Sequence, residues 1–227
     1  KNAHEGYRKV TVRQLVNHTA GLPKDSRHMF GMSDKVSRTC NRRILFTKVL
    51  AEKPDSKPGE KYVYSNLGFM LAGLMAETVT RSSWRELMRK HLFEPLAMKS
   101  AGFGWPGKKD KVDQPWGHTS VFGLAKPIQH DNPEVLGPAG RVHCSVADWP
   151  RFASLQMGHI PNGMKLTKDN LKEMLNDQVN NYSAGWIHVE RPWAGGKARM
   201  HNGSNTMWYA VIWVAPEIDQ AFLAVTN

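Results

Sequence analysis

The sequence is poor in the features that mark metal centres, disulfide frameworks and membrane spans. It has only two cysteines, Cys40 and Cys144, and no Cys-x-x-Cys or cysteine–histidine spacing typical of zinc sites. We therefore expect no zinc site, and two buried thiols rather than a disulfide. The longest apolar runs, 67–76 and 207–215, are far shorter than the roughly 20 residues of a membrane helix, so we expect no membrane span.

Several common catalytic motifs are also missing. There is no Gly-x-Ser-x-Gly and no His-Glu-x-x-His. No signal peptide is visible, and the first residue is lysine rather than methionine. We take the start to be processed or truncated, so the cellular location stays open at this point.

The charge balance is strongly basic, with a net charge of +11 at pH 7. The lysines and arginines are scattered, with small clusters at 38–43 and 108–111 and no basic helix or patch interleaved with aromatic residues. This distribution favours a solvated surface over a nucleic-acid interface. If the chain binds a charged ligand, the positive sign of its net charge would suit a ligand that carries a carboxylate.

The first part of the chain has the periodicity of helices. Thr11 to Gln14 is a capping box that predicts a short helix, and a second helix is predicted from about 41 to 51. Apolar residues at 67, 70, 71 and 74 predict a buried helix over 66–80, and Ser82 or Ser83 would cap another over 84–92. The glycine- and proline-rich stretch 102–138 is interpreted as a long surface loop.

The pattern then changes toward strands. A capping box at 145–148 predicts a helix to about 157, and Thr167 would cap one to about 176. Segments 184–190, 198–201, 207–214 and 221–226 are predicted as strands, the last two joined as a hairpin through 216–219. The fold class is therefore α+β: a mostly helical region 1–140, then 141–227 with helices packed on a terminal antiparallel sheet, together one domain.

Two short segments carry residues suited to chemistry. Tyr64-Ser65-Asn66 lies at the start of the apolar helix, near the positive end of its dipole. A tyrosine has an ordinary pKa of about 10 and needs positive neighbours to act as a base. Asn66 offers a donor and an acceptor to a ligand. By itself the triplet is also compatible with a helix N-cap beside a half-buried tyrosine.

The second segment, His201-Asn202-Gly203-Ser204, precedes a predicted strand. His201 could donate a hydrogen bond to a carboxylate or carbonyl, and glycine at 203 would let a ligand approach the backbone. The following N–H, that of Ser204, could point at a developing oxyanion. By itself this segment is also compatible with a β-turn that carries a surface histidine.

Taken together, the segments resemble a known family. In order they read VRQLVNHTAGLP at 12–23, PGEKYVYSNLGFMLAGL at 58–74, GPAGRVHCSVADWPRF at 137–152, YSAGW at 182–186 and HNGS at 201–204. Across the whole chain they resemble the penicillin-recognising serine hydrolases of the class C β-lactamase type, which include D-alanyl-D-alanine carboxypeptidases, D-aminopeptidases and esterases. The resemblance implies a β-lactamase/transpeptidase-like fold.

The resemblance also implies roles for residues. Tyr64 would be the base or proton relay, and Asn66 a substrate contact. His201 and Gly203 would form the third motif, and the N–H of Ser204 half of the oxyanion hole. The family normally has lysine or histidine at the position of His201, and histidine is typical of its peptidase- and esterase-like members. Asn202 stands where the family usually has a small residue, which affects the width of the wall that the third motif would form in the site. No metal or organic cofactor is implied.

The family's nucleophile motif, Ser-x-x-Lys, is not found, because no serine in these 227 residues has lysine three positions later. The family places it some tens of residues before the segment 18–22, and continues after the terminal strand into a helix that covers the sheet. We therefore expect a chain truncated at both ends. The parent would hydrolyse an amide, ester or lactam of a small molecule or peptide through an acyl-serine intermediate.

Two readings of the function remain at this point. If no Ser-x-x-Lys precedes this chain in its gene, the alternative is a non-catalytic binding or interaction module on the same fold. The resemblance favours a periplasmic or secreted location in bacteria over a cytoplasmic one. The oligomeric state is not predicted.

Overall fold

A computed structural model describes residues 3–29, 38–176 and 179–227. Its helices and antiparallel sheets confirm the α+β class. No helix in these ranges is long and apolar enough to cross a membrane.

The helical part is built around α3, which runs over Asn66–Thr80 as the apolar periodicity predicted. The short helix α1 (Val12–Val16) has the predicted capping box between Thr11 and Gln14. It packs so closely on α3 that a Cβ built on Gly68 would lie 2.3 Å from the carbonyl oxygen of Leu15. This close approach positions the N-terminus of α3. The other elements here are α2 (Arg38–Val49), α4 (Trp84–Met88) followed by a π-helical turn (Arg89–Phe93), and the short α5 (Gly137–Gly140).

The sheet part is a five-stranded antiparallel sheet in the order β5-β6-β7-β8-β9. Its strands are β5 (Tyr182–Ser183), β6 (Trp186–Arg191), β7 (Gly196–Ser204), β8 (Tyr209–Ala215) and β9 (Gln220–Thr226). The predicted hairpin between β8 and β9 turns at Pro216–Ile218, with Asp219 in the left-handed region. Consecutive strands pair throughout, so the sheet forms from local hairpins.

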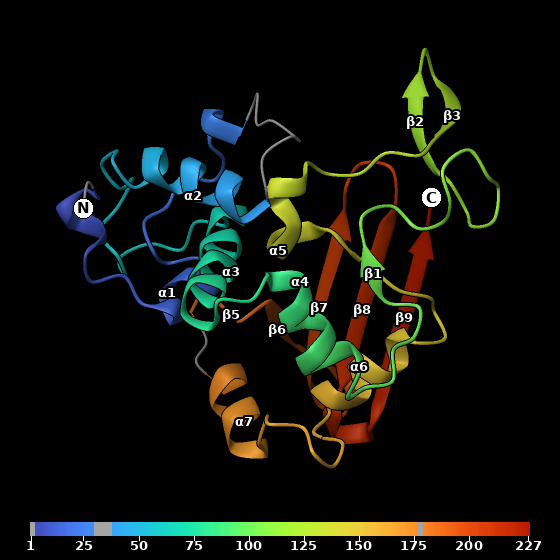
Figure 1. Cartoon of the computed structure of the whole chain (residues 1–227). Helices are drawn as coiled ribbons and strands as arrows, with labels where there is room; N and C mark the ends of the chain where they lie inside the picture. The colour runs from blue at the N-terminus through green and yellow to red at the C-terminus, as the bar shows by residue number, and fades with distance from the viewer. Residues whose placement is uncertain (1–2, 30–37, 177–178) are drawn as a thin grey trace.

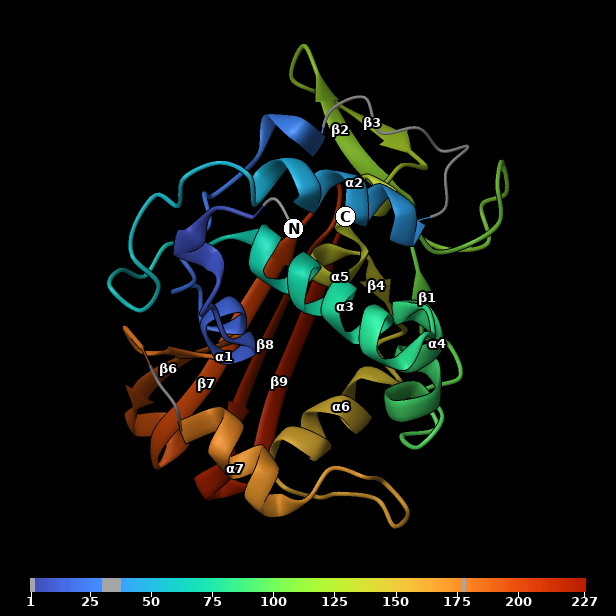
Figure 2. The same cartoon turned by 60° about the vertical axis from the view of Figure 1, so that its left-hand side comes forward.

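Helices cover one face of this sheet (Figure 1). The helices α6 (Trp149–Gln156) and α7 (Lys168–Asn176) contribute Ala153, Leu171 and Leu175 to a buried cluster with Trp186 and Val214 of the sheet. A separate buried cluster joins α1, α2 and α3 and contains Leu15, Leu45, Leu67 and Met70. In the view of Figure 2 α3 crosses in front of the sheet, and the ring of Tyr64, two residues before α3, lies 6.5 Å from that of His201 on β7.

Three expectations need correction. Residues 102–138 are not a plain loop, because β2 (Gly117–Val121) and β3 (Leu124–Ile128) form a hairpin that projects from the body (Figure 1). Its two-residue turn, Phe122-Gly123, has positive φ at both positions, as a type I′ turn requires. The short strands β1 (Gly102–Phe103) and β4 (Val142–His143) also pair with one another.

The second and third corrections concern single side chains. The capping box predicted at 145–148 forms only in part, because the carboxylate of Asp148 accepts hydrogen bonds from Ser100 instead of closing the box. Cys40 and Cys144 form no disulfide, as expected, but Cys40 is exposed rather than buried.

Candidate active site

The helical wall of the site is the segment that leads into α3. Tyr64 is 41% exposed, and Ser65 is the buried N-cap residue of α3. Ser65 makes no capping bond to the helix; its hydroxyl donates to the carbonyl of Pro23 at 2.6 Å, and its N–H donates to Nδ1 of His18 at 3.1 Å. The main chain that carries Tyr64 is therefore anchored to the loop after α1. Asn66 follows as the first residue of α3.

The sheet wall is the second half of β7. The alternative of a β-turn at 201–204 does not hold, since these residues continue the strand and pair with β8, Ser204 opposite Tyr209. On its other side β7 pairs with β6 only from Gly196 to Met200. Among the described residues, His201 to Ser204 thus have an unpaired strand edge, where backbone N–H and C=O groups can meet a ligand. A Cβ on Gly203 would meet no atom within 4 Å, so the space in front of this edge is open.

The two walls meet through a cluster of aromatic rings. The ring centroid of Tyr64 lies 4.3 Å from that of His18 and 6.5 Å from that of His201. Tyr182 of β5 closes the group, with its ring 4.8 Å from His18 and 6.1 Å from His201. Its phenol oxygen is 3.5 Å from Nε2 of His201. Four aromatic side chains from distant parts of the chain thus share one region.

This cluster carries little charge at neutral pH. Burial lowers the pKa of His18 to about 4 and also lowers the pKa of His201. Burial raises the pKa of Tyr64 and of Tyr182. Each group is therefore held in its neutral form, because the charged form would lose hydration on burial and the surrounding groups do not stabilise it enough to compensate. The net charge of +11 is not concentrated on these rings.

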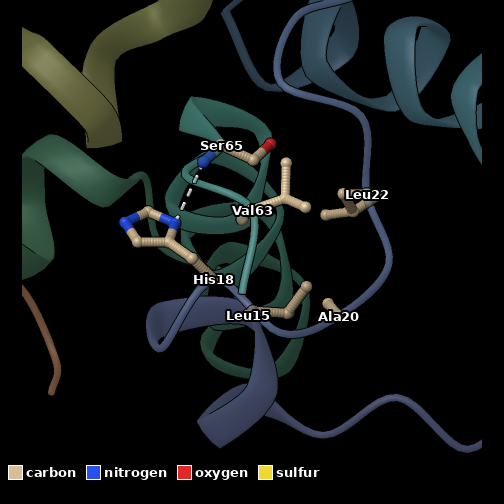
Figure 3. A pocket seen from close by; sticks show the side chains of 7 residues that line it. Leu15, His18, Ala20, Leu22, Val63 and Ser65 are labelled. Carbon is tan, nitrogen blue, oxygen red and sulfur yellow. Dashed lines mark hydrogen bonds between the residues drawn. The ribbon is translucent and has the colours of Figure 1, made fainter. Parts of the chain in front are cut away.

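Figure 3 shows the space behind His18, lined by Leu15, Ala20, Leu22 and Val63. It has no room for a water-sized molecule and is therefore part of the core. A roomier groove of about 390 Å³ lies where Ser204 meets the β2–β3 hairpin, and His118 and Trp208 line it. Ser204 therefore borders both the open edge of β7 and this groove. Within the described ranges no three histidine, cysteine or acidic side chains are grouped as metal ligands.

The sequence comparison decides the family. The sequence model of the family described as beta-lactamase matches residues 1–227, the whole chain. The chain belongs to the beta-lactamase family. Penicillin-binding protein 4 of Amycolatopsis lactamdurans is 24% identical over 97% of this chain and 60% of its own length. Protein flp of Staphylococcus aureus (strain MW2) is 26% identical over 78% of this chain. The chain spans only 36% of the length of that protein.

Solved structures of the beta-lactamase family share this fold. A D-stereospecific amidohydrolase from Streptomyces sp. superposes with a TM-score of 0.75 at 22% identity, over 100% of this chain and 70% of the other. A class C beta-lactamase superposes with a TM-score of 0.73 at 19% identity, over 98% and 67% of the two chains. At these identities the likeness shows the beta-lactamase fold alone.

The fold brings the rings of Tyr64 and His201 to 6.5 Å from one another, and Asn66, Gly203 and Ser204 lie on the same two walls; the roles suggested for these residues stay predictions. The sequence argument missed His18 and Tyr182 as members of the cluster. Both lie in segments that carried the family resemblance, 12–23 and 182–186, but the sequence argument singled out neither residue. Their ring contacts depend on tertiary packing that no local pattern displays.

Proposed function

We propose that this chain supplies two walls of the active site of a serine hydrolase that cleaves an amide, ester or lactam through an acyl-serine intermediate. The nucleophilic serine and its lysine would come from a Ser-x-x-Lys motif encoded outside these 227 residues. The observation that carries the proposal is the approach of Tyr64 to His201, at 6.5 Å between ring centroids, from the start of α3 and the unpaired edge of β7.

In this proposal the serine Oγ passes its proton to the Tyr64 oxygen, deprotonated beside the lysine of Ser-x-x-Lys, and attacks the carbonyl carbon of the substrate. The N–H of Ser204 donates to the oxyanion that forms, at a strand edge open enough for a ligand because Gly203 has no side chain. The tetrahedral species then collapses, the bond to the amine or alcohol breaks, and the leaving group takes up a proton through Tyr64. Water hydrolyses the acyl-serine, which releases the acid and restores the serine.

Tyr64 suits the proton-donating part of this sequence. Burial raises the pKa of its phenol, so the hydroxyl keeps its proton at neutral pH. The rings that contact it, His18, Tyr182 and His201, are neutral as well. To accept the serine proton, Tyr64 needs a cation beside its oxygen, and the lysine of Ser-x-x-Lys would supply that charge.

The neutral sheet wall bears on the choice of substrate. Because burial lowers the pKa of His201, its imidazole at pH 7 offers a hydrogen bond but no full positive charge. We propose that the preferred substrates are uncharged where they contact this wall. The net charge of the chain favoured a carboxylate, but the side chains packed around the site do not add to that preference.

The first experiment reads the coding sequence before Lys1 and expresses the complete gene product. A Ser-x-x-Lys there, with covalent labelling of its serine by a fluorophosphonate, supports the hydrolase. A complete gene without such a motif, and a product that a fluorophosphonate does not label, would contradict it. The non-catalytic binding module would then be the better proposal.

The second experiment tests Tyr64 in the complete protein. Tyr64→Phe should lower kcat for an ester substrate by roughly 10²- to 10⁴-fold, the usual contribution of a positioned acid or base. The matched control is Tyr7→Phe, which removes a phenol remote from the site whose contact with the Gly21 carbonyl is long, at 3.4 Å. Undiminished turnover in Tyr64→Phe removes this residue from the mechanism.

A further inference from the structure

Two consecutive side chains tie the two walls of the candidate site together. Nδ1 of His18 accepts the N–H of Ser65, the neighbour of Tyr64, at 3.1 Å. Oδ1 of Asn17 accepts the N–H of Ala184 at 2.9 Å. Ala184 lies two residues after Tyr182, whose phenol reaches Nε2 of His201. The dipeptide Asn17-His18 after α1 is therefore hydrogen-bonded both to the segment that carries Tyr64 and to the turn after Tyr182, next to His201.

This dipeptide has little freedom to move. Asn17 and His18 are each only 3% exposed. The carbonyl of His18 accepts the N–H of Val63 at 2.8 Å, which adds a second bond to the chain leading to Tyr64. The backbone of His18 has φ of 57°, a left-handed conformation that is uncommon outside glycine and that asparagine, aspartate and histidine adopt more often than other residues. The left-handed backbone directs the ring of His18 between Tyr64 and Tyr182, at 4.3 and 4.8 Å.

The imidazole at this place is not explained by stability alone. Because Nδ1 of His18 accepts a hydrogen bond, the proton of the neutral ring is on Nε2. Nε2 is buried, and no hydrogen-bond partner for it lies in the described part of the chain. An unsatisfied buried donor typically costs about 1–3 kcal/mol. This cost falls on the ring of His18, which contacts Tyr64 and Tyr182 and accepts the N–H of Ser65 before α3.

We propose that Asn17 and His18 are positioning residues that set the separation of Tyr64 from His201, an inference that rests on the proposed hydrolase function. His18 fixes the Tyr64 wall through Ser65, and Asn17 fixes the Tyr182–His201 wall through Ala184. Neither residue touches the reacting atoms. These hydrogen bonds would keep the proton relay, Tyr64, at a fixed position relative to the substrate wall at His201. A misplacement of about 1 Å can lower the rate of the reaction 100-fold.

The test compares two variants of His18 in the complete protein. Asparagine and glycine both tolerate positive φ, and both remove the ring, but only asparagine has an oxygen that can replace Nδ1 as acceptor for Ser65. We expect His18→Gly to have a kcat 10- to 100-fold below that of His18→Asn, with a smaller change in KM. A merely structural role in the turn would lower the amount of folded protein and leave kcat per folded molecule equal in the two variants.

A second measurement needs no turnover. Histidine ¹⁵N NMR should show His18 as the Nε2–H tautomer at pH 7, and it gives the titration midpoint of His201. We expect Asn17→Ala to raise that midpoint toward the ordinary value of about 6.5, because loss of the hydrogen bond between Asn17 and Ala184 frees the turn after Tyr182 and admits water to His201. His18→Asn should leave it unchanged.

The two measurements separate the inference from the function beneath it. The proposal that Asn17 and His18 position Tyr64 relative to His201 is overturned if kcat is equal in His18→Asn and His18→Gly and if Asn17→Ala leaves the titration midpoint of His201 unchanged. If the complete protein has no Ser-x-x-Lys and no turnover, the hydrolase proposal fails, and the NMR titration alone then decides whether the dipeptide positions His201. If His18→Gly does not fold, Asn17→Ala provides the deciding comparison.

Discussion

A buried ion pair connects α3 to its neighbours and provides a quantitative test of the fold. The side chains of Arg42 on α2 and Glu77 on α3 are 3% and 2% exposed. Arg42 donates to both carboxylate oxygens of Glu77, through Nε at 3.3 Å and through Nη2. Oε1 of Glu77 also accepts the N–H of Trp84, the first residue of α4, at 2.9 Å. Three helices therefore depend on one carboxylate.

Arg42→Met should destabilise the protein by about 3–5 kcal/mol, since it leaves a buried carboxylate without its cation. Methionine retains an apolar stem of similar length, so little packing is lost. The double variant Arg42→Met/Glu77→Gln removes both charges and keeps an amide oxygen for the N–H of Trp84. Its cost should be about 1–2 kcal/mol, close to the net value of the lost hydrogen bonds. The double variant should therefore be about 2–3 kcal/mol more stable than Arg42→Met alone.

Urea unfolding of the complete protein measures these differences, with midpoints compared at an unchanged m value. The control is Arg38→Met, whose partner Glu134 is 2.5 Å away but whose side chain is 50% exposed; an exposed pair should contribute under about 1 kcal/mol. If the single and double variants at 42 and 77 lose the same stability, the carboxylate is not held as a buried charge and the reasoning is wrong.

Three further results are expected. Gly68→Ala should destabilise the protein by about 1–3 kcal/mol in chemical unfolding, because its Cβ would lie 2.3 Å from the Leu15 carbonyl oxygen and overpacking outweighs the gain in helix propensity; an unchanged midpoint would show that α1 yields freely. The stability from His18 is complete above its unfolded pKa of about 6.5 and is lost as the pH falls toward its folded pKa of about 4, because only the unfolded form binds the proton. The slope is about 1.4 kcal/mol per pH unit, and His18→Asn should flatten the curve of unfolding free energy against pH. Turnover of an ester with a carboxylate at the His201 wall, relative to its uncharged analogue, should rise only as the pH falls below the ordinary histidine pKa of about 6.5, because burial lowers the pKa of His201 and it gains charge below that value; a ratio independent of pH would show that this wall does not sense the carboxylate.

The sequence was a good guide where one local pattern determined the structure. The helix 66–80 was predicted with its bounds because Leu67, Met70 and Leu74 repeat at helical spacing and are buried. The hairpin at 117–128 was missed because four of the five residues of β3 are exposed, on both faces of the strand, so β3 shows no alternation of buried and exposed residues. Its Phe-Gly turn also lacks the Asn-Gly or Asp-Gly that usually marks a hairpin.

The site shows the same limit. The motifs at Tyr64 and His201 could be recognised only together with the other segments that resemble the family, because each by itself is compatible with ordinary local structure. His18 could not be recognised in this way, because its ring contacts form only when the fold brings residues 18, 64 and 182 together. Asp148 likewise fitted a capping pattern, yet it bonds to Ser100, 48 positions away in sequence. Competition between a local and a distant partner is settled by the tertiary fold.

The bond from Ala184 to Asn17 also has a consequence for how the protein is made. It joins residues 167 positions apart. Contacts of such long range form late, because the chain must close a large loop before the contact returns any stability. At a synthesis rate of about 5–20 residues per second, Asn17 leaves the ribosome roughly 10–30 seconds before its partner does. The helical wall can fold during this interval, while the hydrogen bond between the two walls can form only after the chain has been synthesised beyond Ala184.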